Sequence, residues 1–236
     1  MKALLLAAGY GTRLRPITTK IPKCLVPING KPLLFYWLEM LKNAGVNEIL
    51  INTHYLSEVV VDIVSNSEYS HLVKFVFEEK LLGTGGTLLK NMSFFNNEKF
   101  ILIHADNFSI FDINNFIKFH EERAKHIVIT MLTFITDDPK NCGIVTLDSK
   151  STVIEYTEKI NNPKGNIANG AVYIIDPIIF DFLKNINKKD IDFSKDVLPF
   201  FVNKILSFQD IIYHRDIGTI RNYEIAKNDF LKFLKI

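Results

Sequence analysis

This sequence has few cysteines, and its positive and negative charges nearly balance. Two cysteines in 236 residues are too few for a disulfide framework or a cysteine-based zinc site. Lysine and arginine number 28 against 26 aspartates and glutamates, and a formal net charge of +2 does not favour nucleic acid or a membrane surface as a partner. No apolar run approaches the roughly 18 residues that a membrane span needs. Any basic site must therefore be local, and a reducing cytoplasm is the expected compartment.

The composition, 47% hydrophobic and 23% charged, is that of one globular domain with a sizeable core. Continuous apolar runs of strand length predict strands buried on both faces at 2–7, 48–52, 73–77, 100–103 and 127–132. Amphipathic segments between them predict helices at 32–44, 57–64, 84–90 and 114–123. This alternation predicts an α/β fold: a doubly wound, mostly parallel, Rossmann-like sheet with helices on both faces.

The pattern changes after about residue 140, where strands dominate. Two alternating runs around a polar turn predict a hairpin at 143–147 and 153–156. The remaining segments predict a strand at 171–175, helices at 177–184 and 195–205, a strand at 211–214 and a closing helix from Ile220. We expect these elements to form a β-rich lid on the same single domain.

A glycine-rich loop follows the first predicted strand, in the segment Ala7-Ala8-Gly9-Tyr10-Gly11-Thr12-Arg13-Leu14-Arg15-Pro16. Open α/β sheets bind ligands at this point, and glycines let backbone N–H groups approach phosphate oxygens. Leu14 stands at the third glycine position of the dinucleotide-binding fingerprint, and no Gly-Lys-Ser/Thr follows, so neither that motif nor a P-loop is present. Taken by themselves, the glycines are also explained by a tight turn that binds no ligand.

A lysine between two prolines follows this loop. Lys23 lies in Ile21-Pro22-Lys23-Cys24-Leu25-Val26-Pro27, where the prolines restrict the local backbone. With Arg13 and Arg15 it could form a cationic cage for a polyphosphate.

Together these segments read Leu-x-Ala-Gly-x-Gly-Thr-Arg-Leu-x-Pro-x-Thr-x-x-x-Pro-Lys-x-Leu-x-Pro. The sequence resembles the signature of the sugar-1-phosphate nucleotidyltransferases, and most of all the short bacterial mannose-1-phosphate and heptose-1-phosphate guanylyltransferases. The resemblance implies a cytoplasmic enzyme that joins an NTP to a sugar-1-phosphate, releases pyrophosphate, uses Mg²⁺ and supplies activated sugars for polysaccharide. It also implies a nucleotide-binding half at 1–140 and a sugar-binding half at 141–236 of a single nucleotidyltransferase domain.

The resemblance also assigns roles to particular residues. Arg13, Lys23 and Lys159 are the expected catalytic cations, and Asp106 and Asp216 match the family's metal-binding aspartates. The expected nucleotide-binding residues are Ala7, Ala8, Gly9, Gly11, Thr12, Arg13, Glu78, Gly83 and Thr84. The expected sugar-binding residues are Asp106, Gly143, Glu158, Lys159 and Asn169. Taken singly, an aspartate at a strand end caps a turn and a Glu-Lys pair is unremarkable; their joint occurrence in order favours a site.

Four departures from the family pattern leave the charged groups intact. Cys24, Ile160 and Ile220 replace prolines, and His104-Ala105 replaces the commoner Asn-Gly before Asp106. They make the backbone geometry of these loops less predictable.

Glu78 is expected to contact the edge of the base. An ionised carboxylate only accepts hydrogen bonds, which suits the guanine N1–H and N2 amino group and favours GTP. CTP, UTP and dTTP stay open as alternatives, as do a phosphorylated acceptor other than a sugar and a non-catalytic regulatory homologue that senses nucleotide sugars. A homo-oligomer also stays open.

Overall fold

The computed structural model describes residues 1–233, which form two compact units. One unit contains Met1–Lys80, Ile103–Ile110 and the chain from Ile212 on, and the other contains Leu81–Leu102 and Phe111–Ile211. Strand β6 (Phe100–His104) runs from the second unit into the first. A functional division at residue 140 stays a prediction.

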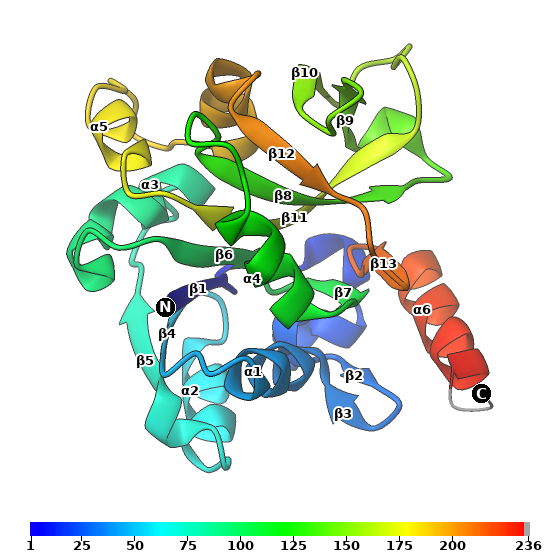
Figure 1. Ribbon diagram of the computed structural model, residues 1–236. Coiled ribbons are helices and arrows are strands. Elements are labelled where there is room, and N and C mark those ends of the chain that lie inside the picture. The colour runs from blue at the N-terminus through cyan, green and yellow to red at the C-terminus, as the bar shows by residue number, and fades with distance from the viewer. Residues whose placement is uncertain (234–236) are drawn as a thin grey trace. The chain divides into compact units, whose positions relative to one another are not determined.

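A parallel sheet forms the centre of the first unit. Its strands β1 (Lys2–Leu6), β4 (Glu48–Thr53) and β5 (Val73–Phe77) lie side by side in that order, as the blue and cyan arrows in Figure 1 show. The helices α1 (Leu33–Asn43) and α2 (Ser57–Ser65) provide the crossovers that parallel pairing requires. Since the carboxyl ends of parallel strands share one edge, the loops after these strands lie together.

The rest of the first unit is built around a strand pair far apart in sequence. Strand β7 (Asn107–Ile110) pairs antiparallel with β13 (Tyr213–Asp216), and helix α6 (Ile220–Phe233) follows. The short strands β2 (Pro27–Ile28) and β3 (Lys31–Pro32) pair with each other. A shared core joins these elements and consists of Leu14, Val26, Ile28, Leu33, Phe108, Ile217, Tyr223 and Ala226.

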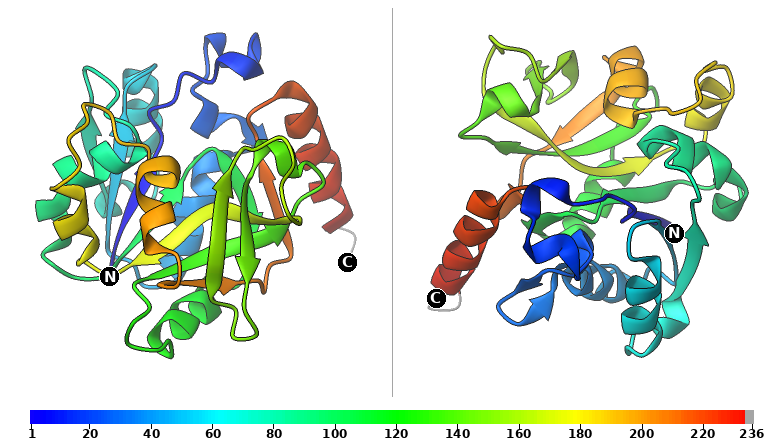
Figure 2. Two further views of the ribbon diagram at one scale, coloured as in Figure 1. Left: turned by 90° about the horizontal axis from the view of Figure 1, so that it is seen from above. Right: turned by 180° about the vertical axis from the view of Figure 1, so that it is seen from behind.

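Antiparallel pairing dominates the second unit. Strand β11 (Ile167–Ile175) pairs antiparallel with β8 (Ile129–Ile135) and β9 (Gly143–Leu147), and β9 pairs with β10 (Val153–Glu158) in the predicted hairpin. The helices of this unit are α3 (Thr84–Lys90), α4 (Ile113–Glu121) and α5 (Ile179–Leu183). Figure 2 shows the hairpin as the two long green strands of the left view.

The predicted helix at 195–205 is wrong. The chain instead forms a short π-helix (Phe193–Val197) and a 3₁₀-helix (Leu198–Phe201), and then strand β12 (Ile205–Phe208), which pairs parallel with β8. Pro199 lacks the N–H group that a continuous helix needs, so the helix is interrupted there.

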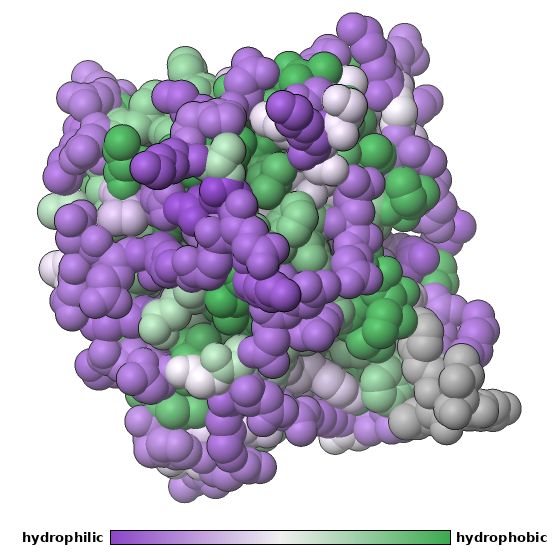
Figure 3. Space-filling model, viewed as in Figure 1, coloured by the Kyte–Doolittle hydropathy of each residue, from purple (hydrophilic) through white to green (hydrophobic). Residues whose placement is uncertain are grey.

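Hydrophilic residues predominate on the face of the molecule in Figure 3, with hydrophobic side chains scattered among them. Across residues 1–233, every helix is too short or too polar to pass through a bilayer.

Candidate nucleotidyltransferase site

The glycine-rich loop is held against the lysine segment in the first unit. Gly11 has a positive φ of 63°, and a Cβ atom there would lie 3.0 Å from Thr18 Cγ2 and 3.2 Å from Lys23 Cβ. Thr18 Oγ1 also donates a hydrogen bond of 2.7 Å to the Gly11 carbonyl oxygen. Glycine is therefore required at position 11 for its conformation and for this close packing. Ala7 and Ala8 are buried, whereas Gly9, Thr12 and Arg13 are exposed.

Lys23 lies between the two predicted metal-binding aspartates. Its Nζ atom is 2.5 Å from Asp106 Oδ2 and 3.0 Å from Asp216 Oδ1, and only 9% of its side chain is exposed. Burial alone would lower the pKa of Lys23, but the charges of Asp106 and Asp216 and their hydrogen bonds raise it above the ordinary 10.5. Burial would likewise raise the pKa of Asp106, but the Lys23 charge and hydrogen bond, with the nearby His104, lower it.

The β7–β13 pair explains why these aspartates meet. Asp216 pairs with Asn107, the residue after Asp106, and the Ile217 N–H donates to the Asp106 carbonyl oxygen at 3.2 Å. The Arg13 guanidinium lies 4.0 Å from Asp216 Oδ2 with 71% of its side chain exposed. The site therefore combines a buried ammonium, two carboxylates and an exposed guanidinium beside a glycine-rich loop.

The donor set fits a hard divalent cation. The carboxylates of Asp106 and Asp216 converge on one cationic group, Lys23 Nζ, and oxygen ligands are those that Mg²⁺ prefers. Over the described part of the chain, no three His, Cys, Asp or Glu side chains cluster closely enough to bind a metal ion alone. Further ligands would have to come from water or from phosphate oxygens.

Glu78 is buried, with 1% of its surface exposed. Asn52 Nδ2 donates to Glu78 Oε1 at 3.1 Å, and Asn52 Oδ1 accepts a hydrogen bond of 2.8 Å from the Ala7 N–H. Asn52 thus links the start of the glycine-rich loop to the predicted base-contacting residue. Sequence reasoning missed Asn52, because its only signal is its place at the end of a buried strand.

A second glycine-rich motif, Leu82-Gly83-Thr84-Gly85-Gly86, contains the predicted nucleotide-binding residues Gly83 and Thr84 and is in the second unit. Gly83 has a positive φ of 75°, and a Cβ atom there would lie 2.4 Å from the Ile191 carbonyl oxygen. The Gly85 N–H donates to the same oxygen at 2.7 Å, and Thr84 Oγ1 accepts from the Phe193 N–H at 2.7 Å. The approach of the Ile191 backbone thus gives Gly83 a packing role that the motif does not reveal.

Two of the predicted sugar-binding residues, Gly143 and Glu158, lie opposite each other on the β9–β10 hairpin, and Lys159 follows directly. Gly143 pairs with Glu158, and a Cβ atom at Gly143 would lie 2.4 Å from Tyr156 Oη and 2.6 Å from Glu158 Oε2. Tyr156 donates a hydrogen bond of 2.5 Å to Glu158 Oε2, and burial, followed by the neighbouring Tyr173 and Glu158, raises the pKa of Tyr156. Glycine at position 143 therefore leaves the space in which Glu158 is held. Tyr156 was not anticipated, since a tyrosine in a strand is usually core.

Lys159 and Asn169 lie where the backbone departs from regular geometry. Lys159 has a positive φ of 51°, its Nζ atom lies 3.4 Å from Glu158 Oε1, and 58% of its side chain is exposed. Such conformations in a residue other than glycine are often found at functional sites. Asn169 borders a register shift in the β11–β8 pair, where its Oδ1 atom accepts from the Ala171 N–H at 2.9 Å.

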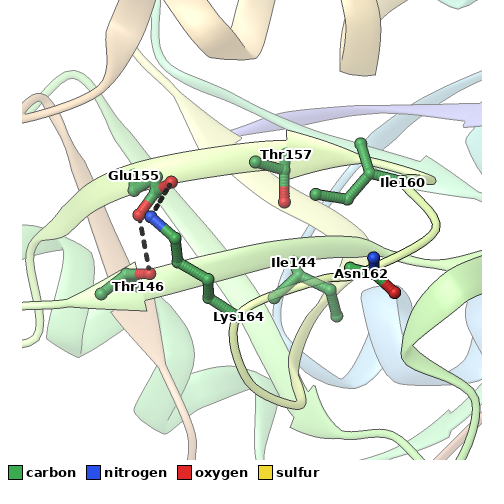
Figure 4. Close-up of a pocket in the computed structure, with 7 residues that line it drawn as sticks. All are labelled: Ile144, Thr146, Glu155, Thr157, Ile160, Asn162 and Lys164. Carbon is green, nitrogen blue, oxygen red and sulfur yellow. Dashed lines mark hydrogen bonds and ion pairs between the residues drawn. The ribbon is translucent and has the colours of Figure 1, made fainter.

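The opposite face of the hairpin carries a small cavity of about 50 Å³, shown in Figure 4. Ile144 and Thr157, which pair across the strands, point to this face, whereas Gly143 and Glu158 belong to the other. Lys164 lies beside Glu155 here at 3.4 Å, so its ammonium group is directed away from the predicted sugar site.

The structure thus gathers the predicted residues into two sets, one in each unit. The first unit holds Ala7, Ala8, Gly9, Gly11, Thr12, Arg13, Lys23, Glu78, Asp106 and Asp216. The second holds Gly83, Thr84, Gly143, Glu158, Lys159 and Asn169.

Comparison with known proteins agrees with these motifs. The family model described as "Nucleotidyl transferase" matches residues 2–232. The chain belongs to the nucleotidyl transferase family. It is 29% identical over 243 residues to the "Probable mannose-1-phosphate guanylyltransferase 1" of Oryza sativa subsp. japonica, covering 100% of this chain and 66% of that protein. It is 28% identical over 240 residues to the "UTP--glucose-1-phosphate uridylyltransferase" of Synechocystis sp., covering 94% and 61%.

The fold is also similar to that of HddC from Yersinia pseudotuberculosis, solved in complex with GMP-PN. That similarity has a TM-score of 0.79 at 28% identity and covers 97% of this chain and 99% of that one. The comparisons confirm the predicted family and the predicted fold class. The chain spans 61–66% of the length of the two curated relatives named above.

Proposed function

We propose that this chain transfers a nucleoside monophosphate from an NTP, with GTP preferred, to a sugar-1-phosphate of mannose or heptose type and releases pyrophosphate. The observation that carries the proposal is the placement of Lys23 Nζ between Asp106 and Asp216, with Gly11 packed on the same lysine. This arrangement sets cationic and carboxylate groups beside a loop suited to phosphates, in a member of the nucleotidyl transferase family.

The chemistry needs alignment and charge neutralisation rather than a general base. A sugar-1-phosphate oxygen is already an anionic nucleophile, and its attack on the α-phosphorus brings two anions together. The exposed guanidinium of Arg13 suits the β- and γ-phosphates, since its planar fork binds phosphate oxygens in pairs. Lys23 would neutralise charge near the reacting phosphorus once a phosphate takes the place of its carboxylate partners.

Asp106 and Asp216 would hold one or two Mg²⁺ ions. A bound divalent ion supplies electrostatic stabilisation of the phosphate oxygens. Asp106, directly before β7, and Asp216, at the end of β13, would contribute oxygen donors, and the direct pairing of these strands fixes the spacing of the carboxylates.

The acceptor site is proposed on the hairpin of the second unit. Glu158 would accept hydrogen bonds from sugar hydroxyls, and Asn169 would pair with further hydroxyls. Lys159, exposed and held at a positive φ, would bind the sugar phosphate. Gly143 supports this assignment because any larger residue would collide with Glu158.

GTP preference rests on Glu78. Its carboxylate is held by Asn52, and an acceptor-only group suits guanine. UTP is the first alternative, because a relative of similar identity is named as a uridylyltransferase. CTP and dTTP follow.

A pyrophosphate-release assay with Mg²⁺ tests the proposal, crossing GTP, ATP, CTP, UTP and dTTP with mannose-, heptose-, glucose- and glucosamine-1-phosphates. Release with GTP and mannose- or heptose-1-phosphate supports the full proposal, and release with another pair corrects the substrate alone. If no pair of substrates releases pyrophosphate but a nucleotide still raises the melting temperature, the result would indicate a non-sugar acceptor or a regulatory protein. A cytoplasmic location, which the free Cys24 and Cys142 favour, is part of this proposal.

A further inference from the structure

The imidazole ring of His54 has a partner on each of its nitrogens. Nδ1 lies 2.7 Å from the Glu78 carbonyl oxygen, and Nε2 lies 2.8 Å from Tyr10 Oη. A carbonyl oxygen can only accept a hydrogen bond, so Nδ1 must carry the proton and donate. In the neutral ring, Nε2 then accepts from the Tyr10 hydroxyl. The two contacts together fix both the tautomer and the orientation of the ring.

These contacts join three loops that follow neighbouring parallel strands. Tyr10 is in the glycine-rich loop after β1, His54 follows β4, and Glu78 follows β5. Asn52 makes a second link between the same segments, from the Ala7 N–H to the Glu78 carboxylate. The glycine-rich loop and the Glu78 segment are therefore tied twice, by Asn52 inside the unit and by His54 nearer to solvent.

Ring packing supports the outer link. Tyr10 and His54 meet edge to face, with ring centroids 5.1 Å apart, and Phe77 stacks on His54 at 6.4 Å with an interplanar angle of 21°. Tyr10 is 46% exposed and Phe77 is 55% exposed. Water competes for hydrogen bonds at such positions, so the link adds little to the stability of the fold. Its effect should appear instead in how well the two loops are arranged for a ligand.

We propose that His54 is a positioning residue for the nucleoside triphosphate. By binding Tyr10 and the Glu78 backbone at once, it holds the phosphate-binding loop and the base-contacting segment in one arrangement before the nucleotide arrives. Ordering two loops in advance removes an entropic cost from binding. The inference rests on the proposed function, since it assumes that both segments contact one nucleotide. In this role His54 acts through Tyr10 and Glu78, and no contact with the phosphates or the reacting atoms is assigned to it.

The test compares Tyr10→Phe, which removes one hydroxyl, with His54→Phe, which keeps a ring and removes both hydrogen bonds. We expect the KM for GTP to rise about 5-fold in the first and about 5- to 20-fold in the second, as one or two hydrogen bonds are lost. We expect kcat to stay within about 2-fold, and the melting temperature and the KM for the sugar-1-phosphate to stay unchanged. The double variant should be little worse than His54→Phe alone, because both changes break the same link.

Two matched controls show whether any aromatic or hydroxyl change has the same effect. Tyr36→Phe removes a comparable hydroxyl bond, to the Ile28 carbonyl oxygen at 2.8 Å, and His71→Phe replaces an exposed histidine. Both should leave the KM for GTP unchanged. An unchanged KM in His54→Phe, or strictly additive losses in the double variant, would overturn the inference. A joint fall of kcat and melting temperature would also overturn it, because that pattern indicates a structural role alone.

Direct binding keeps this test separate from that of the proposed function. Calorimetric titration with GTP, without sugar phosphate, should give a weaker affinity for His54→Phe than for the wild type. Equal affinities would overturn the positioning role even if the enzyme is active. An inactive wild type that binds GTP more tightly than His54→Phe would overturn the proposed reaction and leave this inference supported.

Discussion

Lys23 Nζ lies 2.5 Å from Asp106 Oδ2, so a side-chain ammonium sits at the point where the proposed reaction needs a divalent cation. The same atom is 3.0 Å from Asp216 Oδ1. Two carboxylates at one place repel each other unless a positive charge lies between them. Lys23 supplies that charge within the protein itself. A metal ion bound by these carboxylates would compete with Lys23 for the same oxygens, and the lysine would then be released to meet the phosphates.

Lys23→Met tests this competition. Without the ammonium, the carboxylates of Asp106 and Asp216 should bind Mn²⁺ at least about 10-fold more tightly in the absence of nucleotide, a change of about 1.4 kcal/mol. Turnover should nevertheless fall, since a cation near the reacting phosphates is lost. Calorimetry with Mn²⁺ and pyrophosphate release measure the two effects. Lys227→Met, at a half-buried lysine paired with Glu224, is the matched control. Weaker metal binding by Lys23→Met would contradict the competition.

Asp106→Asn and Asp216→Asn should each reduce turnover by at least about 100-fold. Each substitution removes one charge from the proposed metal site. A metal ion stabilises the transition state by several kcal/mol, and each 1.4 kcal/mol, roughly, changes the rate tenfold, so losing the ion would cost more than this factor. Lys23 keeps one carboxylate partner in either single variant, so the fold should survive with a modest loss of melting temperature. Pyrophosphate release and thermal unfolding provide the two measurements. Near-normal turnover in either variant would remove that residue from the metal site.

The local motifs of the site could be predicted from the sequence, whereas its supporting contacts could not. The glycine-rich loop and Lys23 lie within one short stretch, whose signature is visible in the sequence. The meeting of Asp106 with Asp216 was implied by resemblance only, because it depends on the pairing of β7 with β13. The partners of Asn52 and His54 are likewise set by strands that neighbour one another only in the folded sheet.

The errors in the predicted elements have physical causes. Most of the segment 195–205 does form helical turns, but as a short π-helix and a 3₁₀-helix, because Pro199 lacks the N–H group that one continuous α-helix needs. Strand β12 begins only at Ile205, the last residue of the segment, and its place is set by pairing with β8, a partner distant in sequence. Gly83 shows a similar limit, since the Ile191 backbone that packs against it lies more than a hundred residues away.

Glu78→Gln should erode the preference for GTP. The glutamine side chain offers a donor as well as an acceptor, which weakens its match to guanine and improves its match to uracil. Asn52 can still donate to the amide oxygen of glutamine, so the segment should stay in place. The ratio of kcat/KM for GTP to that for UTP is the measurement, and we expect it to fall about 10-fold or more. Glu79→Gln, at the exposed neighbour, controls for charge. An equal nucleotide profile in wild type and Glu78→Gln would exclude Glu78 from base recognition.

Stability should depend on pH through His120. Burial lowers the pKa of His120 below its ordinary 6.5, and the nearby Arg123 adds to this, although Asp176 opposes it. The unfolded chain therefore takes up a proton near pH 6.5 that the folded chain resists. The resulting stability is complete above pH 6.5 and is lost as the pH falls from 6.5 through the folded-state pKa.

Urea unfolding between about pH 7.5 and 5.5 measures this loss. His120→Gln should show a shallower fall in unfolding free energy over the same range, because no imidazole titrates there. The substitution also disturbs the hydrogen bond between His120 Nδ1 and Thr130 Oγ1, which are 2.8 Å apart in the wild type. We therefore also expect a drop in stability that is the same at every pH. His126→Gln, at an exposed histidine, should keep the wild-type slope. The same slope in His120→Gln and the wild type would rule out His120 as the source.

Lys159→Ala should raise the KM for the sugar-1-phosphate without changing the KM for GTP. The exposed ammonium of Lys159 lies next to Glu158, and loss of a charge-assisted contact to a phosphate costs about 1.5–3 kcal/mol, or about 10- to 150-fold in affinity. Alanine also adopts a positive φ with difficulty, so Lys159→Gly separates the loss of charge from backbone strain, and both variants should behave alike. Lys164→Ala removes another exposed lysine, on the opposite face of the hairpin, and should leave both KM values unchanged. Equal effects of Lys159→Ala and Lys164→Ala would mean that the general charge of the hairpin, and not a specific phosphate contact, attracts the acceptor.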